Sequence, residues 1–295
     1  TVQTEDEDHD GIEILSSAIE LNGGSLTASG NPPIDLTLPV VDTSGVKVDG
    51  LLATIVAITP PESRQYLLNE VISFHVTFSE PVYVTYTPRL RLNIRTGGST
   101  IRSARYAAGS GTNVLRFDYK VGTSDEDQDG VALSVTGTPT SPITLGTSTR
   151  IRDLGGNNAY LLYTTNDAYP DLRVDGIVPK VTSVARSPST TVYLQPGATA
   201  DFLVNYGEAV VVTGTPRLRI VVGTTTRYAL YRPDLSTPTQ LVFRHTILPG
   251  ERDSNGIAIY SPLELDGGSV RDLPGNTANL NLYSIASMTG LRVGC

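Results

Sequence analysis

Alternating apolar and polar side chains run through most of the chain and predict β-strands. In the segment 71–78, Phe74, Val76 and Phe78 alternate with polar residues, so one face of this strand is expected to be buried. No segment keeps the 3.6-residue period of an amphipathic helix, so essentially no helix is expected. Across the middle of the chain, the pattern predicts strands near 53–58, 71–78, 89–95, 101–107, 113–120, 131–135, 148–152 and 159–163.

One order of strand and turn motifs occurs twice in full and once in part. The block Thr87–Leu92, for example, reads Thr-Pro-Arg-Leu-Arg-Leu, and its counterpart Thr215–Ile220 differs from it only in the final residue. Self-similarity at this spacing fixes the domain organisation before any site is considered. It predicts a partial repeat at 1–50, a full repeat at 51–176 and a second full repeat at 177–295.

The short strands of each complete unit are bounded by Gly, Pro, Asn and Asp, which is typical of a two-sheet antiparallel sandwich. Each complete unit exceeds a hundred residues, enough to bury one core without disulfides. The expected fold is therefore all-β, with tandem immunoglobulin-like antiparallel β-sandwiches. Gly50 and Gly176 end the first two units and are expected to supply unusual backbone angles there. Short linkers of this kind, stiffened by nearby prolines, predict a rod.

Residues 1–50 match only the back half of a unit and lack counterparts of 51–119, which carry the first five predicted strands. A few leftover strands cannot close a two-sheet core. One explanation, which we favour, is that the rest of this unit precedes Thr1. The other is strand complementation, in which a neighbouring chain completes the sandwich and builds a filament. The C-terminal unit has no spare strands to offer, which weighs against the second explanation.

Composition and charge narrow the class further. The chain has 28 Gly and 19 Pro among 295 residues and only 18% charged residues, as expected for an extracellular or cell-surface β protein. Its net charge of −8 is gathered in loops, which argues against nucleic-acid binding. No apolar run approaches the ~20 residues of a membrane-spanning helix, so membrane insertion is not expected. The lone cysteine, Cys295, excludes an internal disulfide framework and is either an ordinary terminal residue or a covalent tether.

Three acidic turns, at 6–11, 125–130 and 251–256, place oxygen-bearing side chains at alternate positions before a glycine. Such side chains can converge on one hard cation, and Ca²⁺ accepts six to eight oxygen ligands. None of the turns has the Glu that an EF-hand needs at loop position 12, so further ligands must come from elsewhere. Strand counting places Asp153 and Asn157, like Asp272 and Asn276, at the same end of their units as these turns, where they are candidates for the further ligands. The predicted Ca²⁺ ligands are therefore Asp6, Asp8, Asp10, Asp125, Asp127, Asp129, Asp153, Glu251, Asp253, Asn255 and Asp272.

A second explanation for each acidic turn is that its side chains only cap their own turn. In the last turn Arg252 stands among the acidic residues, so the two explanations weigh equally there. Glu80 and Glu208 follow the second predicted strand of their units and are expected at the opposite pole. There they are expected to meet the linker residues Asp49 and Asp175, which otherwise read as turn formers.

The segments 76–82, 87–90, 104–106, 109–112 and 153–157, together with the acidic turn, resemble the bacterial Ig-like, cadherin-like tandem repeats of large secreted and surface proteins. The resemblance covers essentially the whole chain. It implies extracellular stalks, adhesins or appendage subunits, often rigidified by calcium, whose partners include other copies or upstream repeats. The chain departs from the pattern at Ala209, where a proline is usual, and in the last acidic turn.

No enzyme motif stands out. The three histidines lie in different contexts, neither a G-x-S-x-G elbow nor a phosphate-binding loop is present, and no Trp is available as a sugar platform. The expected function is a non-enzymatic, calcium-stiffened rod segment of a surface adhesin. The alternatives are a filament subunit completed by a neighbouring chain and an accessory module of a carbohydrate-active enzyme.

Arginines on alternate positions of two equivalent strands suggest one further partner. Arg89 and Arg91 recur as Arg217 and Arg219 and offer a stripe for a host or surface glycan. A solvated strand face protected by charge is the preferred explanation of this pattern.

Overall fold

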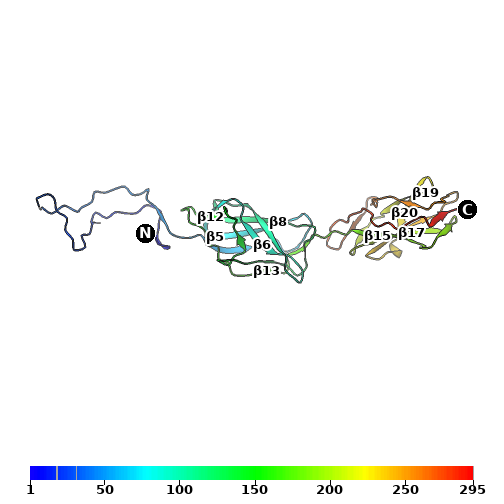
Figure 1. The fold of residues 1–295 in the computed structure, drawn as a ribbon, viewed down its shortest axis with the longest axis horizontal. Helices are drawn as coiled ribbons and strands as arrows, with labels where there is room; N and C mark the ends of the chain where they lie inside the picture. The colour runs from blue at the N-terminus through cyan, green and yellow to red at the C-terminus, as the bar shows by residue number, and fades with distance from the viewer. Residues whose placement is uncertain (18, 31, 295) are drawn as a thin grey trace.

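The computed structural model describes residues 1–17, 19–30 and 32–294, so Cys295 and its predicted tether lie outside the described residues. An extended N-terminal segment, a middle unit and a C-terminal unit follow one another along the long axis (Figure 1). The described part contains no α-helix, and its helical structure is one 3₁₀ turn, η1 (Pro233–Leu235). The all-β prediction is confirmed. No helix in the described part is long and apolar enough to cross a membrane.

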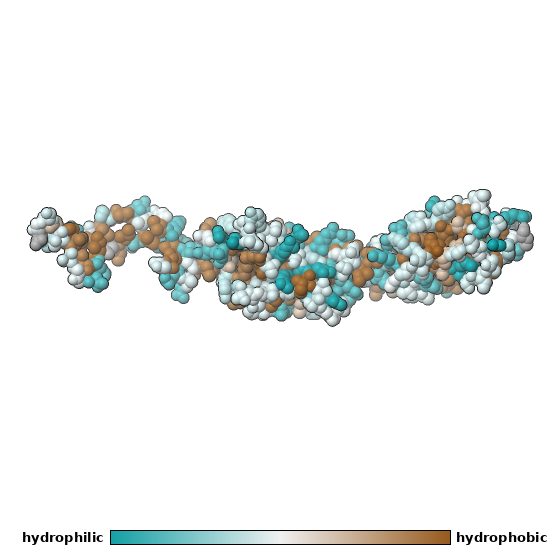
Figure 2. All heavy atoms as spheres, viewed as in Figure 1, coloured by the Kyte–Doolittle hydropathy of each residue, from teal (hydrophilic) through white to brown (hydrophobic). Residues whose placement is uncertain are grey.

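The described part of the N-terminal segment has no core of its own. Its two strands, β1 (Glu7–Asp8) and β2 (Val48–Asp49), pair antiparallel with each other. No described residue among 1–50 is buried. Figure 2 shows apolar side chains lying open along this segment. The expectation that a half unit cannot close a core is therefore confirmed.

The middle unit combines a nine-stranded sheet with a three-stranded sheet. The large sheet has the order β12-β5-β8-β7-β6-β10-β13, with β3 paired to β5 and β11 paired to β6. The small sheet has the order β4-β14-β9, in which β14 runs parallel to β4. The bounds are β3 (Ile55–Thr59), β4 (Gln65–Leu67), β5 (Val71–Thr85), β6 (Arg89–Asn93), β7 (Ile101–Ala108), β8 (Thr112–Lys120), β9 (Glu126–Asp127), β10 (Val131–Leu133), β11 (Ile143–Thr144), β12 (Arg150–Arg152), β13 (Ala168–Tyr169) and β14 (Arg173–Asp175).

The core of the middle unit lies between these sheets. Phe74 and Phe117, directly opposite each other on β5 and β8, are fully buried, as the alternation predicts. Tyr66 and Val174 of the small sheet belong to the same core. Every predicted segment except 159–163 contains a strand, and that one makes only an isolated bridge.

The C-terminal unit repeats this plan. Its largest sheet has the order β15-β17-β21-β20-β19-β22, and two pairs, β16-β24 and β18-β23, stand apart from it. Phe202 and Phe243 occupy the places of the two middle-unit phenylalanines and are fully buried. The bounds are β15 (Val181–Ser187), β16 (Val192–Leu194), β17 (Thr199–Tyr206), β18 (Val211–Thr213), β19 (Arg217–Val222), β20 (Thr225–Tyr231), β21 (Gln240–Thr246), β22 (Ala258–Ile259), β23 (Ser269–Arg271) and β24 (Leu291–Val293).

The glycines that end the first two units are required for close approach of the backbone. A Cβ atom on Gly176 would lie 1.8 Å from the carbonyl oxygen of Gly122, and one on Gly50 would lie 2.0 Å from that of Gln3. Neither glycine has a positive φ. The expectation of unusual backbone angles is therefore wrong, because the constraint is space beside the preceding acidic turn.

Candidate metal centre at the first junction

Three carboxylates meet where the N-terminal segment joins the middle unit. One oxygen from each of Asp49, Glu80 and Asp153 lies within 4.8 Å of one from each of the others. Asp49 ends β2, Glu80 lies within β5, and Asp153 directly follows β12. Across residues 1–17, 19–30 and 32–294, no other group of three acidic, histidine or cysteine side chains is held this closely.

Asp153 is the most enclosed of the three carboxylates, with only 3% of its surface exposed. Its Oδ1 accepts a hydrogen bond of 2.8 Å from the backbone N–H of Asn157, which fixes the side chain in the loop after β12. Its Oδ2 is buried and has no hydrogen-bond partner among the described residues. A buried polar atom without a partner is rare and unfavourable, and this one belongs to the carboxylate group just described.

The linker residue Asp49 is held against the same loop. The side-chain amide of Asn157 donates hydrogen bonds to the carbonyl oxygens of Asp49, at 3.0 Å, and Leu51, at 3.2 Å. A Cβ atom on Gly155 would lie 2.3 Å from Asp49 Oδ2, so glycine leaves the space that this carboxylate occupies. The loop after β12 therefore positions two of the three carboxylates.

The electrostatics of the group disfavour three negative charges. Burial raises the pKa of Glu80, and the neighbouring charges of Asp153, Asp49 and Glu7 raise it further, while His9 acts in the opposite direction. Both Glu7 and His9 line a cavity of about 850 Å³ together with Glu80 and Asp49. A cation in this cavity would relieve the repulsion among these carboxylates.

The prediction that Glu80 meets Asp49 is confirmed, but the predicted position of Asp153 is wrong. Asp153 lies at the first junction. The acidic turn of the same unit lies instead at the second junction, where the middle unit meets the C-terminal unit, and its Glu126 pairs there with Asp175. The reason is the length of β5, which continues past 78 to Thr85 and pairs with β12 through that added part. The chain after β12 therefore emerges near the preceding unit.

The carboxylates of the middle acidic turn accept hydrogen bonds from the protein. Asp127 binds the backbone N–H groups of Arg95 at 2.8 Å and Gly130 at 2.7 Å. Asp125 accepts hydrogen bonds from Arg102 Nε and Gly122 N–H and from the Tyr119 hydroxyl. Asp129 accepts one from the N–H of Gly97. The geometry is that of a self-contained turn, and calcium binding by this turn stays a prediction.

The last acidic turn uses the same contacts. Glu251 takes the place of Asp125 and accepts a hydrogen bond of 2.6 Å from Arg227 Nε and one of 3.0 Å with His245. Asp253 accepts hydrogen bonds from the N–H groups of Gly223, Asn255 and Gly256.

The first acidic turn makes fewer contacts. Asp8 accepts a hydrogen bond from Gly11 and Asp6 one from Gln3, while Asp10 is exposed. Of the eleven predicted ligands, only Asp153 lies in the close carboxylate group.

The second junction carries the counterparts Asp175, Glu208 and Asp272, yet its hydrogen bonding differs. The Asn276 side-chain amide donates to Asp272 Oδ2 at 2.9 Å and to the Asp175 carbonyl oxygen at 3.1 Å. In turn, Asn276 Oδ1 accepts a hydrogen bond from the Leu68 N–H of the middle unit. At the second junction the Asn276 amide thus donates to Asp272 Oδ2. The equivalent oxygen at the first junction, Asp153 Oδ2, has no partner among the described residues.

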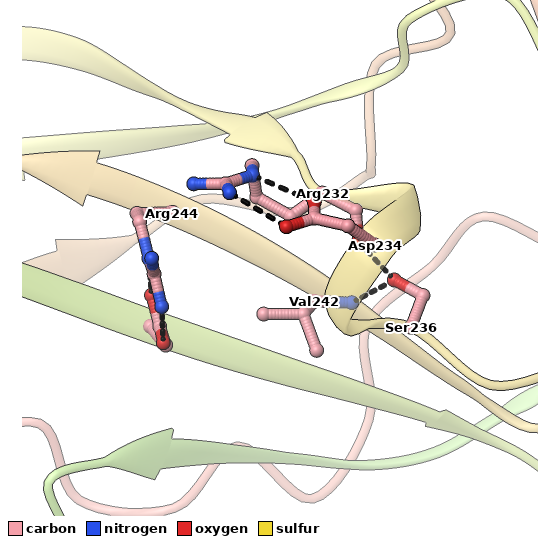
Figure 3. Close-up of polar contacts among 6 residues, drawn as sticks. Arg232, Asp234, Ser236, Val242 and Arg244 are labelled. Carbon is pink, nitrogen blue, oxygen red and sulfur yellow. Dashed lines mark hydrogen bonds and ion pairs between the residues drawn. The ribbon is translucent and has the colours of Figure 1, made fainter.

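Several arginines of the C-terminal unit form ion pairs. Arg217 lies 3.1 Å from carboxylate oxygens of both Glu264 and Asp266. Figure 3 shows Arg232, which binds both carboxylate oxygens of Asp234. Arg244, also labelled in Figure 3, belongs to a second such pair. It makes two contacts of 2.6 Å each with the carboxylate of Asp201.

The equivalent arginines of the middle unit lack these partners. Arg89 and Arg105 face each other across β6 and β7, and Thr144 stands opposite Arg89 where Glu264 stands opposite Arg217. Among the described residues, Arg89, Arg91 and Arg105 make no ion pair.

Comparisons with known proteins identify no family for this chain. No family model matches, and a search of curated proteins finds no match. A solved structure, that of a DUF4785 family protein from Legionella pneumophila, is 10% identical over 72% of this chain, with a TM-score of 0.23. The chain spans half the length of that protein.

Proposed function

We propose that this chain is a non-enzymatic structural segment of an extracellular or cell-surface rod, built from immunoglobulin-like β-sandwich units. The construction of the second junction supports this proposal. Residues that leave the middle unit are paired with its acidic turn, through Asp175 and Glu126, and the next unit binds them through Asn276. A linker bonded on both sides holds two units in a fixed relation, which is what a stiff spacer requires.

Small-angle X-ray scattering tests the rod directly. A compact chain of 295 residues has a radius of gyration of about 19 Å. Two units placed end to end, with strands as long as the 15-residue β5, are expected to give more than about 25 Å. A value near 19 Å would contradict the proposal.

A second candidate function is binding of an anionic glycan on the outer face of the middle unit. Its support is the cluster of Arg89, Arg91 and Arg105, which no described carboxylate neutralises although the chain as a whole is acidic. Because the matching arginines Arg217 and Arg219 are ion-paired, the two units are expected to differ in this property. Arginine clusters of this kind attract sulfate and carboxylate groups in a salt-dependent way.

Heparin, a sulfated polyanion, is a suitable probe for this second function. The double variant Arg89→Ser/Arg91→Ser is expected to weaken binding at least tenfold at low salt. The matched variant Arg217→Ser/Arg219→Ser is expected to leave it nearly unchanged. Equal effects of both variants, or no binding by the unaltered chain, would remove this candidate.

A further inference from the structure

The unpaired oxygen of Asp153 distinguishes this carboxylate group from an ordinary cluster of acidic side chains on a protein surface. Only 3% of the surface of Asp153 is exposed, so its carboxylate is enclosed by the protein. Within the described part of the chain its Oδ2 has no hydrogen-bond partner, while Oδ1 is fixed by the N–H of Asn157. The Asp153 carboxylate also lies within 4.8 Å of those of Asp49 and Glu80. The group therefore lacks a positively charged or donating partner at its centre.

Protein cations do not fill this role in the structure. Lys47 and His9 line the adjoining cavity, but neither makes an ion pair with Asp49, Glu80 or Asp153. His9 is instead bonded to Glu7.

The type and number of ligands select the ion. Mg²⁺ usually keeps several waters and binds one or two carboxylates, whereas Ca²⁺ takes more oxygen ligands and accepts three carboxylates such as these. Ca²⁺ also tolerates an irregular shell, in which water from the adjoining cavity completes the six to eight ligands.

The second junction provides an internal comparison. There, the Asn276 amide occupies Asp272 Oδ2 and is itself held by the Leu68 N–H. The Asn157 amide instead binds two carbonyl oxygens, those of Asp49 and Leu51, and leaves Asp153 Oδ2 alone. The two junctions contain equivalent residues, but the asparagine amide binds the aspartate oxygen only at the second junction.

We propose that Asp49, Glu80 and Asp153 bind one Ca²⁺ ion at the first junction, and that the second junction is closed by Asn276 without an ion. This inference deepens the proposed rod function by naming the ligand of one junction. Because Asp49 belongs to the linker and the other two ligands belong to the middle unit, the ion connects the N-terminal segment to that unit. The acidic turns are not ligands of this ion.

Calorimetric titration of the full chain with CaCl₂ after chelator treatment tests the site. The expected result is one Ca²⁺ per chain, with binding weakened at least tenfold by Glu80→Gln and unaffected by the matched variant Glu208→Gln. Asp153→Asn, which keeps the shape of the side chain, is expected to abolish binding. Its fold is checked by the near-UV circular dichroism of the unit, and Glu80→Gln alone decides the result if Asp153→Asn does not fold.

Several outcomes would overturn the proposal. They are no Ca²⁺ binding up to millimolar concentration, equal losses from Glu80→Gln and Glu208→Gln, and loss of binding through Asp127→Asn with Glu80→Gln unaffected. Scattering data collected in chelator separate the two claims. An extended chain that does not bind Ca²⁺ would leave the rod intact and remove only the ion.

Discussion

At the scale of single residues, Asp127 shows how the acidic turns are built. It is 1% exposed and accepts backbone hydrogen bonds from Arg95 and Gly130. Asp127→Ala leaves these two donors without partners and is expected to lower the free energy of unfolding of the middle unit by about 1–3 kcal/mol. Asp129→Ala, at an exposed position with one such bond, is expected to lower it by much less. Thermal unfolding measured with calcium and with chelator should give the same loss, and a loss seen only with calcium would show that the turn binds the ion.

Glu208 gives a test by pH at the second junction. Burial raises its pKa above 4.5, as do the charges of Asp272 and Asp175, so the folded state binds this proton more tightly than the unfolded state. The free energy of unfolding therefore falls as pH rises from 4.5 through the raised pKa, and the penalty persists at neutral pH. Glu208→Gln is expected to stabilise the chain at pH 7 by up to about 1 kcal/mol, the scale of a partly screened charge pair. The gain should vanish below pH 4, and a destabilised variant at pH 7 would contradict this account.

At the scale of elements, each complete unit depends on its own pair of phenylalanines. Phe117 of β8 and Phe243 of β21 are fully buried in separate cores. Phe117→Ala and Phe243→Ala are each expected to cost about 3–5 kcal/mol. Scanning calorimetry should show that each variant shifts one unfolding transition and leaves the other in place. A single transition shifted equally by both variants would show that the units unfold together.

The sequence predicted the elements whose side chains alternate over several residues. The buried faces of β5 and β6 follow from the positions of Phe74, Val76, Leu90 and Leu92. Some short strands, such as β4 and β14, lie outside every predicted segment, although the equally short β10 and β12 were predicted. The prediction also ended the strand of 71–78 too early, and the position of Asp153 is set by the continuation of β5 to Thr85.

Only part of the carboxylate group could be predicted from the sequence. Strand counting placed Glu80 beside Asp49, which the structure confirms. The missing partner of Asp153 Oδ2 depends on where one Asn157 amide points, and no pattern of residue types encodes that choice.

At the scale of the whole molecule, the N-terminal segment should behave differently from the two units. Ile12 is 37% exposed and Ile14 41% exposed, whereas their counterparts Val131 and Leu133 are buried. Limited proteolysis is expected to remove residues 1–50 first and leave 51–294 intact. Light scattering is expected to show a monomer. A stable oligomer with a protected segment would instead support completion of this half unit by a neighbouring chain.

The central claim is that hydrogen bonds across the second junction hold the two complete units in one fixed relation. It is tested most directly by the distance distribution between spin labels placed at Val56→Cys and Leu230→Cys, both exposed, with Cys295 changed to Ser. The account predicts one narrow distribution, which broadens when Asn276→Ala removes the bridge between Asp175, Asp272 and Leu68. A broad distribution in the chain with Asn276 intact would contradict it.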